Sequence, residues 1–208
     1  HLGSSNVNTG SFNLITGYIN QVTKSYCAAV GRENLIGGEA DYSFAHGYKG
    51  RANKYGQAVQ ASGMFVSAGD AQRSVLTARR NSTDATPVVL TLDGAAPATA
   101  NRILVSSTSG NLECACAYEI HVVAAKQGSP EVDCGRWEFE GIMAKGASNA
   151  STTKIAGEVA STPQLAGTLS TATVAITADT TNGAITITGT GVLATNINWF
   201  ADIILREV

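Results

Sequence analysis

Apolar and polar positions alternate with a period of two along much of residues 112–145, which predicts half-buried strands and no helix. In "LECACAYEIHVVAAK" one face carries Leu112, Cys114, Cys116, Tyr118, Ile120 and Val122, while the other carries Glu113, Glu119 and His121. In "RWEFEGIMAK" one face carries Trp137, Phe139 and Met143, while the other carries Arg136, Glu138 and Glu140. The aromatic residues Tyr118 and Trp137 are therefore expected in a core.

The C-terminal segment continues this pattern. "TVAITADTTNGAITITG" reads as a β-hairpin, with Asn-Gly at 182–183 between two β-branched runs. The last strand places on one face Ile197, Trp199, Ala201, Ile203 and Leu205. Strands every 10–15 residues without a helical period predict an antiparallel β-sandwich.

The first third of the chain follows a longer period. The phrases "FNLITG", "YCAAVG", "YSFAHG" and "AVQASG" end at Gly17, Gly31, Gly47 and Gly63, in steps of 14, 16 and 16 residues, and Gly3 lies 14 residues earlier. Each phrase opens at Phe12, Tyr26, Tyr42 or Ala58 and has an apolar residue two places before its glycine, namely Ile15, Ala29, Ala45 or Ala61. A period this short suits one coil of a β-solenoid, with the small residue facing a narrow interior.

The phrases "YSFAHG" and "YCAAVG" resemble the Asn-Ser-x-Ala-x-Gly repeat of trimeric autotransporter adhesin heads, a repeat that phage tail fibres and tailspikes also carry. This resemblance implies a left-handed parallel β-roll built from three intertwined chains. Coils so poor in large apolar residues bury little surface alone, which also favours a homotrimer.

A second resemblance lies downstream. The segment "GDAQRSVLTARRNSTDATPVVLTLDG" resembles one that opens the C-terminal modules of phage tail fibres, and "NINWFADIILREV" is similar to their last strand. We therefore expect an all-β protein: a trimeric left-handed β-roll shaft at 1–68, followed by a β-sandwich tip at 69–208.

Composition narrows the partners. Only 14% of residues are charged and the net charge is −2, which argues against nucleic acid. No apolar run reaches the roughly 18 residues of a membrane span, so membrane insertion is not expected. The four cysteines, Cys27, Cys114, Cys116 and Cys134, are expected to be reduced packing residues.

Titratable residues offer no convergent catalytic set. His121 and Glu119 share a strand face, and Glu138 and Glu140 lie about 6.5–7 Å apart along one strand, but an exposed face lacks the burial that raises the pKa of a general acid. We expect no catalysis, no metal site and no cofactor.

The resemblances imply a phage tail fibre or tailspike fragment. Such a protein would be assembled in the host cytoplasm, belong to the virion and act outside the cell, where it attaches to a bacterial surface polysaccharide or lipopolysaccharide. The candidate glycan-binding residues are Tyr48, Tyr55, Glu119, His121, Arg136, Glu138 and Glu140. Two alternatives stay open: a structural trimerisation or head-fibre module that binds no receptor, and the terminal domain of a tailspike whose depolymerase lies upstream.

Overall fold

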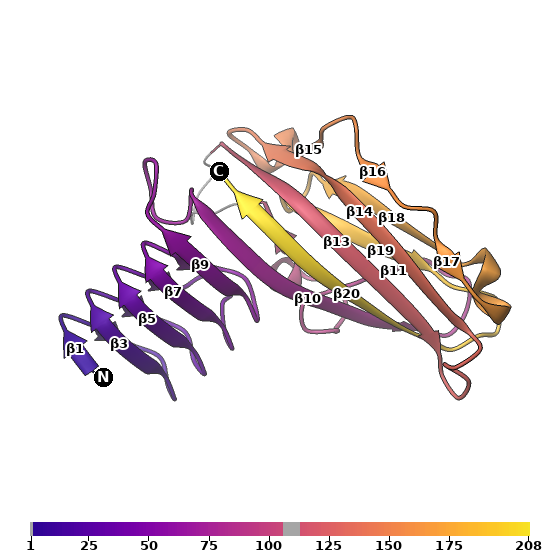
Figure 1. The fold of residues 1–208 in the computed structure, drawn as a ribbon, viewed down its shortest axis with the longest axis horizontal. Helices are drawn as coiled ribbons and strands as arrows, with labels where there is room; N and C mark the ends of the chain where they lie inside the picture. The colour runs from indigo at the N-terminus through magenta and orange to yellow at the C-terminus, as the bar shows by residue number, and fades with distance from the viewer. Residues whose placement is uncertain (1, 106–112) are drawn as a thin grey trace.

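The computed structural model describes residues 2–105 and 113–208, and these form an all-β protein (Figure 1). The helical segments among them are three short 3-10 turns: η1 (Thr99–Asn101), η2 (Asn149–Ser151) and η3 (Gly167–Thr171). The chain begins as a β-solenoid of about four turns. The predictions of an all-β fold and of an N-terminal solenoid are confirmed.

Each coil of the solenoid supplies one longer and one shorter strand. The longer strands pair in parallel as β1 (Leu2–Ser4), β3 (Leu14–Tyr18), β5 (Ala28–Arg32), β7 (Phe44–Tyr48) and β9 (Ala58–Ser62). The shorter ones form a second parallel sheet of β2 (Val7–Asn8), β4 (Gln21–Val22), β6 (Leu35–Ile36) and β8 (Arg51–Ala52). Between the two sheets lies a thin core that includes Ile15, Val22, Ala29, Ile36 and Ala45.

The strand register confirms the first three copies of the repeat and corrects the fourth. Gly3, Gly17, Gly31 and Gly47 are in register across β1, β3, β5 and β7. Gly47 then pairs with Ala61, so the expected alignment with Gly63 is wrong by two residues. Val59 takes the interior position that the alignment gave to Ala61.

The reason for this error is a substitution at one corner of the coil. Phe12, Tyr26 and Tyr42 turn that corner with φ of 58–60° and stack their rings 5.2 and 5.0 Å apart. In the last coil Gly56, with φ of 64°, turns the same corner. Glycine replaces the aromatic residue that marks this corner in the other coils. The last coil, which is 14 residues long, was therefore predicted from the sequence to be 16 residues long.

The glycine column lets the coils approach closely. At Gly31, φ is +117°, and a Cβ atom there would lie 2.2 Å from the carbonyl oxygen of Gly47. Side chains are excluded from such a position both by the backbone conformation and by the neighbouring coil. This explains why the repeat retains glycine where other solenoid positions vary.

A buried asparagine ladder runs beside the glycine column. The Oδ1 atom of Asn20 accepts the backbone N–H of Asn34 at 3.0 Å and its side-chain amide at 3.0 Å, and Asn6 serves Asn20 in the same way. The Oδ1 atom of Asn34 in turn accepts the backbone N–H of Gly50 at 2.9 Å. The ladder therefore satisfies turn backbone groups that the strands leave unpaired. This role was not predicted from the sequence.

The solenoid runs directly into a long antiparallel sheet. Strand β9 pairs antiparallel with β10 (Gln72–Ser82), and the sheet continues through β20 (Ile197–Glu207), β13 (Cys114–Lys126) and β14 (Cys134–Lys145). Three short strands complete its far edge: β15 (Thr153–Lys154), β16 (Val159–Ala160) and β17 (Gln164–Leu165). Among the described residues, one sheet of twelve strands thus runs from the solenoid through the long antiparallel strands (Figure 1).

A four-stranded sheet shares the second core with these long strands. It contains β11 (Val88–Val89), β19 (Ala184–Thr190), β12 (Ile103–Leu104) and β18 (Thr173–Asp179). The core joins Leu76, Ile120, Trp137 and Trp199 of the long strands to Ile187 of the smaller sheet. The predicted hairpin is confirmed as β18 and β19, connected by residues 180–183.

The predicted strand faces are also confirmed. Cys116, Tyr118, Ile120 and Val122 of β13 are buried, as are the predicted inner residues of β14 and β20. Leu112, which was predicted for the same face of β13, lies outside the described residues. The four cysteines are free thiols in the structure, with Cys27 and Cys116 buried.

We predict that Gly31→Ala lowers the free energy of unfolding by at least about 3 kcal/mol, because it combines a disfavoured φ with a backbone collision. Gly56→Ala is the matched control: φ there is +64° and no atom lies within 4 Å of the added carbon. It should cost about 1 kcal/mol, from backbone conformation alone. Urea unfolding of both variants measures the difference, and equal losses would show that the coils do not approach as closely as described.

Candidate functional site

The outward face of the long antiparallel strands gathers five of the predicted site residues. Glu119 and His121 lie on β13, and Arg136, Glu138 and Glu140 lie on β14. The register sets Glu119 opposite Glu140 and His121 opposite Glu138. Strand alternation turns all five side chains away from the core, so the structure brings together residues that the sequence placed only on separate strands.

Ion pairs link these side chains both along a strand and between strands. Arg206 of β20 contacts Glu119 at 3.0 Å, and Arg136 is ion-paired with Glu138. The Nε2 atom of His121 lies 3.9 Å from Glu119 Oε1 and 4.0 Å from Glu138 Oε1. Exposed pairs of this kind contribute at most about 1 kcal/mol each to stability. Their main effect is to hold charged groups at fixed places on the sheet.

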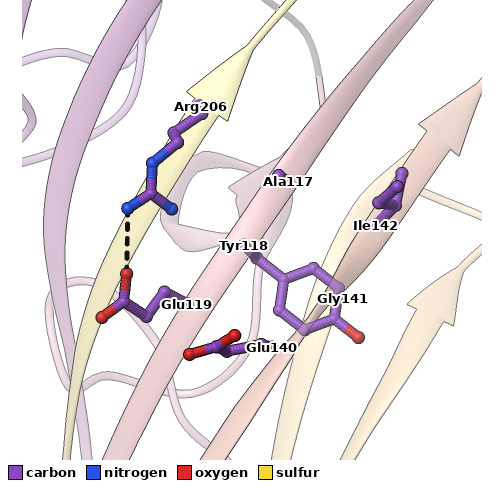
Figure 2. Close-up of a pocket in the computed structure, with 7 residues that line it drawn as sticks. All are labelled: Ala117, Tyr118, Glu119, Glu140, Gly141, Ile142 and Arg206. Carbon is purple, nitrogen blue, oxygen red and sulfur yellow. Dashed lines mark hydrogen bonds and ion pairs between the residues drawn. The ribbon is translucent and has the colours of Figure 1, made fainter. Parts of the chain in front are cut away.

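A hollow opens on this face beside the two carboxylates (Figure 2). Its volume is about 370 Å³, and it is lined by Ala117, Tyr118, Glu119, Glu140, Gly141, Ile142 and Arg206. Figure 2 shows Glu119 and Glu140 on adjacent strands, with Arg206 reaching Glu119 from β20. The small residues Ala117 and Gly141 leave room between the charged groups and Ile142.

Gly141 also makes room for the ring of Tyr118. A Cβ atom at Gly141 would lie 2.4 Å from the Tyr118 hydroxyl, which donates a hydrogen bond to Glu158. Burial, together with the Glu158 carboxylate, raises the pKa of Tyr118 well above its ordinary range. Tyr118 is 1% exposed, and Trp137 and Trp199 are buried too. The prediction that these three aromatic residues pack in the core is confirmed.

A second hollow adjoins the first at the end of the solenoid. Its volume is about 410 Å³, and its lining includes Gln60, Phe65, Arg73 and Val208 together with Arg206, which also lines the first hollow. Gln60, Arg73 and Arg206 stand side by side, because each is paired with the next across β9, β10 and β20. Because Arg206 lines both hollows, we call them together the track, which runs from the end of the solenoid to β14.

An aspartate fixes one wall of the second hollow. Asp70 accepts the backbone N–H groups of Phe65, Val66 and Ser67 at 2.8, 2.7 and 2.6 Å. Partial burial raises the pKa of Asp70, but these three donors outweigh it and hold the pKa below its ordinary value. The Phe65 ring, 75% exposed, is thus carried by a loop with a defined backbone.

The two remaining predicted residues, Tyr48 and Tyr55, lie on the solenoid and do not join the carboxylates. Tyr48 ends β7, and its ring lies 5.5 Å from the guanidinium of Arg32. Tyr55 is half-buried and packs beside Tyr42, with ring centroids 5.5 Å apart. Arg73, Arg206 and Phe65 were missed from the sequence. Arg73 and Arg206 become neighbours only through pairing of strands that are far apart in the chain.

Binding is the simplest chemistry of this track. Carboxylates and guanidinium groups form strong hydrogen bonds with hydroxyl and acidic groups. Glu119 and Glu140 are also a cross-strand carboxylate pair, whose Cβ atoms lie roughly 4.5–5.5 Å apart by strand geometry. Glycosidases use pairs of carboxyl groups. Within residues 2–105 and 113–208, no group of three or more His, Cys, Asp or Glu side chains is placed to hold a metal ion.

No protein-family model and no curated protein matches the sequence. Three of the solved structures that match are phage tailspikes. The tailspike of Acinetobacter phage vB_ApiP_P1 has 9% identity and a TM-score of 0.36 over 94% of this chain. The tailspike of Acinetobacter baumannii phage AM24 has 6% identity and a TM-score of 0.34 over 97% of this chain. The tailspike of Acinetobacter baumannii bacteriophage Fri1 has 9% identity and a TM-score of 0.32 over 95% of this chain. That protein is described as a capsular polysaccharide depolymerase. The chain spans 36–48% of the length of these three proteins.

The expectation that this protein is not an enzyme is wrong in the light of these matches, because one of the matched tailspikes is a depolymerase. The sequence places Glu138 and Glu140 along one strand, whereas the register sets a further carboxylate pair, Glu119 and Glu140, opposite each other on adjacent strands, which the sequence alone does not show. In the described part of the chain no helix is long and apolar enough to cross a bilayer.

We predict that Asp70→Ala speeds amide exchange at Phe65, Val66 and Ser67 near neutral pH, because these N–H groups lose their acceptor. A carboxylate whose pKa is lowered by folding stabilises the loop above its unfolded pKa, and this contribution is lost as the pH falls through the folded pKa. Protection in the wild-type loop should therefore persist below the ordinary aspartate pKa. Asp84→Ala is the control, since Asp84 caps a different turn through Thr86. Unchanged protection in Asp70→Ala would contradict the role given to Asp70.

Proposed function

We propose that this protein is part of a bacteriophage tail fibre or tailspike and binds a capsular or other surface polysaccharide of a bacterium. The observation that carries the proposal is the track of two adjoining hollows, about 370 and 410 Å³, that share Arg206. A polymer needs several neighbouring contact points, and an extended row of polar side chains on a rigid sheet supplies them. The tailspikes that match the chain point to the same class, although the proposal depends on the track.

The chemistry of the track suits a sugar chain. Glu119 and Glu140 can accept hydrogen bonds from hydroxyl groups, and Arg206 can donate them. Phe65 and Ile142 give apolar surface at the two ends, against which the C–H faces of a sugar ring can pack. Of the other predicted residues, His121, Arg136 and Glu138 continue along β13 and β14 beyond the first hollow, and Tyr48 and Tyr55 lie apart on the solenoid.

The proposed architecture has a shaft at residues 1–68 and a tip at 69–208. We infer that the shaft is a left-handed β-roll shared by three chains and that the tip is a β-sandwich. Support for a trimer comes from side chains that the single chain leaves in water: Leu14 is 58% exposed and Phe44 is 40% exposed on the outward face of the solenoid. Association would bury them, and three linked copies of a weak site would bind a repeating polymer more tightly.

The assembly is tested by mass. We expect light scattering to give about three times the 21.4 kDa chain mass. Phe44→Ser should shift the protein toward smaller species, because it removes apolar surface from the proposed contact. Phe65→Ser, at an exposed loop, is the control and should leave the mass unchanged. A stable, folded wild-type monomer would overturn the trimer.

The binding function is tested with polysaccharide extracted from susceptible bacteria. We expect the wild-type protein to bind it, and Glu140→Gln to weaken binding by about tenfold, as expected for loss of one charged hydrogen-bond acceptor. Lys24→Gln, on a solenoid turn outside the track, should bind as the wild type does. Failure of the intact wild-type protein to bind polysaccharide from any susceptible strain would favour the structural-module alternative.

Hydrolysis is the second candidate, and the cross-strand pair Glu119 and Glu140 is what favours it. The same experiment reads it out, because size-exclusion chromatography of the polysaccharide shows whether the polymer is shortened. If it is, Glu140→Gln should slow the shortening by two or more orders of magnitude, roughly the contribution of one acid–base group. Shortening that persists at the wild-type rate in Glu140→Gln would remove this pair from the reaction.

A further inference from the structure

Two arginines face each other across the centre of the track. Arg73 of β10 and Arg206 of β20 are direct partners in the antiparallel register, and both side chains are exposed on the outward face. Like charges placed directly opposite on neighbouring strands destabilise a sheet. This arrangement destabilises the protein by itself, and a negative charge between the two arginines would offset the repulsion.

The protein compensates only one of these charges. Arg206 is ion-paired with Glu119 at 3.0 Å. Arg73 has no ion pair or hydrogen bond from its side chain to any residue that the structure describes. Its neighbour on β9 is Gln60, which is uncharged. The second hollow therefore contains an exposed guanidinium whose charge is unmatched and whose donors are available.

Negative charge gathers at the other end of the track. Arg73 and Arg206 share a row of the sheet with Ala117, and Glu119 and Glu140 stand opposite each other two residues further along β13 and β14. The two cations and the two carboxylates are therefore diagonal neighbours on the outward face. Glu119 already neutralises Arg206, and Glu140 lies on the far side of Glu119 from Arg73. Glu207 also lines the second hollow, but its carboxylate is paired with the buried Lys54 at 2.8 Å and accepts a hydrogen bond from Gln72. A ligand can therefore supply the charge that Arg73 lacks.

We propose that an anionic group of the bound polysaccharide, a carboxylate or a phosphate, binds between Arg73 and Arg206. This proposal rests on the proposed function and names its substrate class, an acidic polysaccharide. Guanidinium groups bind both anions through paired, charge-assisted hydrogen bonds. The hydroxyl groups of the adjoining sugar would then lie toward Glu140, so the charge order of the track also fixes the direction of the polymer.

The test uses Arg73→Glu, with polysaccharide from a susceptible strain as the probe. The variant replaces a like-charge pair with an opposite-charge pair, so its melting temperature should equal or exceed that of the wild type. Binding should nevertheless weaken by about tenfold or more, since a charged donor is lost and a repulsive carboxylate is gained. Lys24→Glu makes the same charge change on a distant solenoid turn and should bind as the wild type does.

Chemical treatment of the probe distinguishes the two anions. Carboxyl reduction of the polysaccharide should abolish the difference between wild type and Arg73→Glu if the group is a carboxylate. Removal of phosphate with hydrofluoric acid should do so if it is a phosphate. Wild-type binding that survives both treatments unchanged, or Arg73→Glu binding equal to that of the wild type, would overturn the proposal while leaving polysaccharide binding intact. Loss of all wild-type binding to the untreated probe would instead count against the proposed function.

Discussion

The pairing of β9 with β10 is the interaction on which the rest of the molecule depends. Up to β9 every longer strand runs parallel to the last, and at β10 the chain reverses, with Gln60 opposite Arg73 and Ala61 opposite Gln72. A parallel stack that ended at β9 would leave an exposed edge, which invites pairing with other chains. The pairing of β9 with β10, which we call the seam, covers that edge and joins the solenoid and the antiparallel strands into one sheet. The outward track exists only because this sheet is continuous.

A buried polar network lies on the inward side of the seam. Lys54, which is fully buried, contacts Glu207 at 2.8 Å, and Gln72 donates to the same carboxylate at 2.8 Å. Ser74 donates to Glu207 and accepts a hydrogen bond from Gln57 at 2.8 Å. Burying an ion pair carries a desolvation penalty, so its gain in stability is small. Its geometric demand is strict, because loop 53–57, β10 and β20 must meet in one register to satisfy every group.

The sequence predicted those features that depend on neighbours along the chain. Alternation identified the buried faces of β13, β14 and β20, and the spacing of Gly17, Gly31 and Gly47 identified the coils. The sequence-based prediction failed at Gly56, where glycine replaces the aromatic residue of the repeat. It also failed for residues whose role depends on pairing between distant segments. Arg73 and Arg206 are ordinary surface residues until the register sets them opposite each other. The candidate residues on β13 and β14 were predicted as two separate strand faces, and only the pairing of the strands brings the two faces together.

The asparagine ladder gives the shaft a property of its own. Each rung satisfies the coil that follows it in the same way, from Asn6 to Asn20 to Asn34, and Gly50 receives the last bond without adding a rung. A unit of 14 residues that contains the glycine and the asparagine could therefore be duplicated or deleted with little disturbance of its neighbours. Reach could then vary in steps of one coil, about 4.8 Å, while the seam and the track stay unchanged. Length and recognition are separable in this design, so selection could act on one without rebuilding the other.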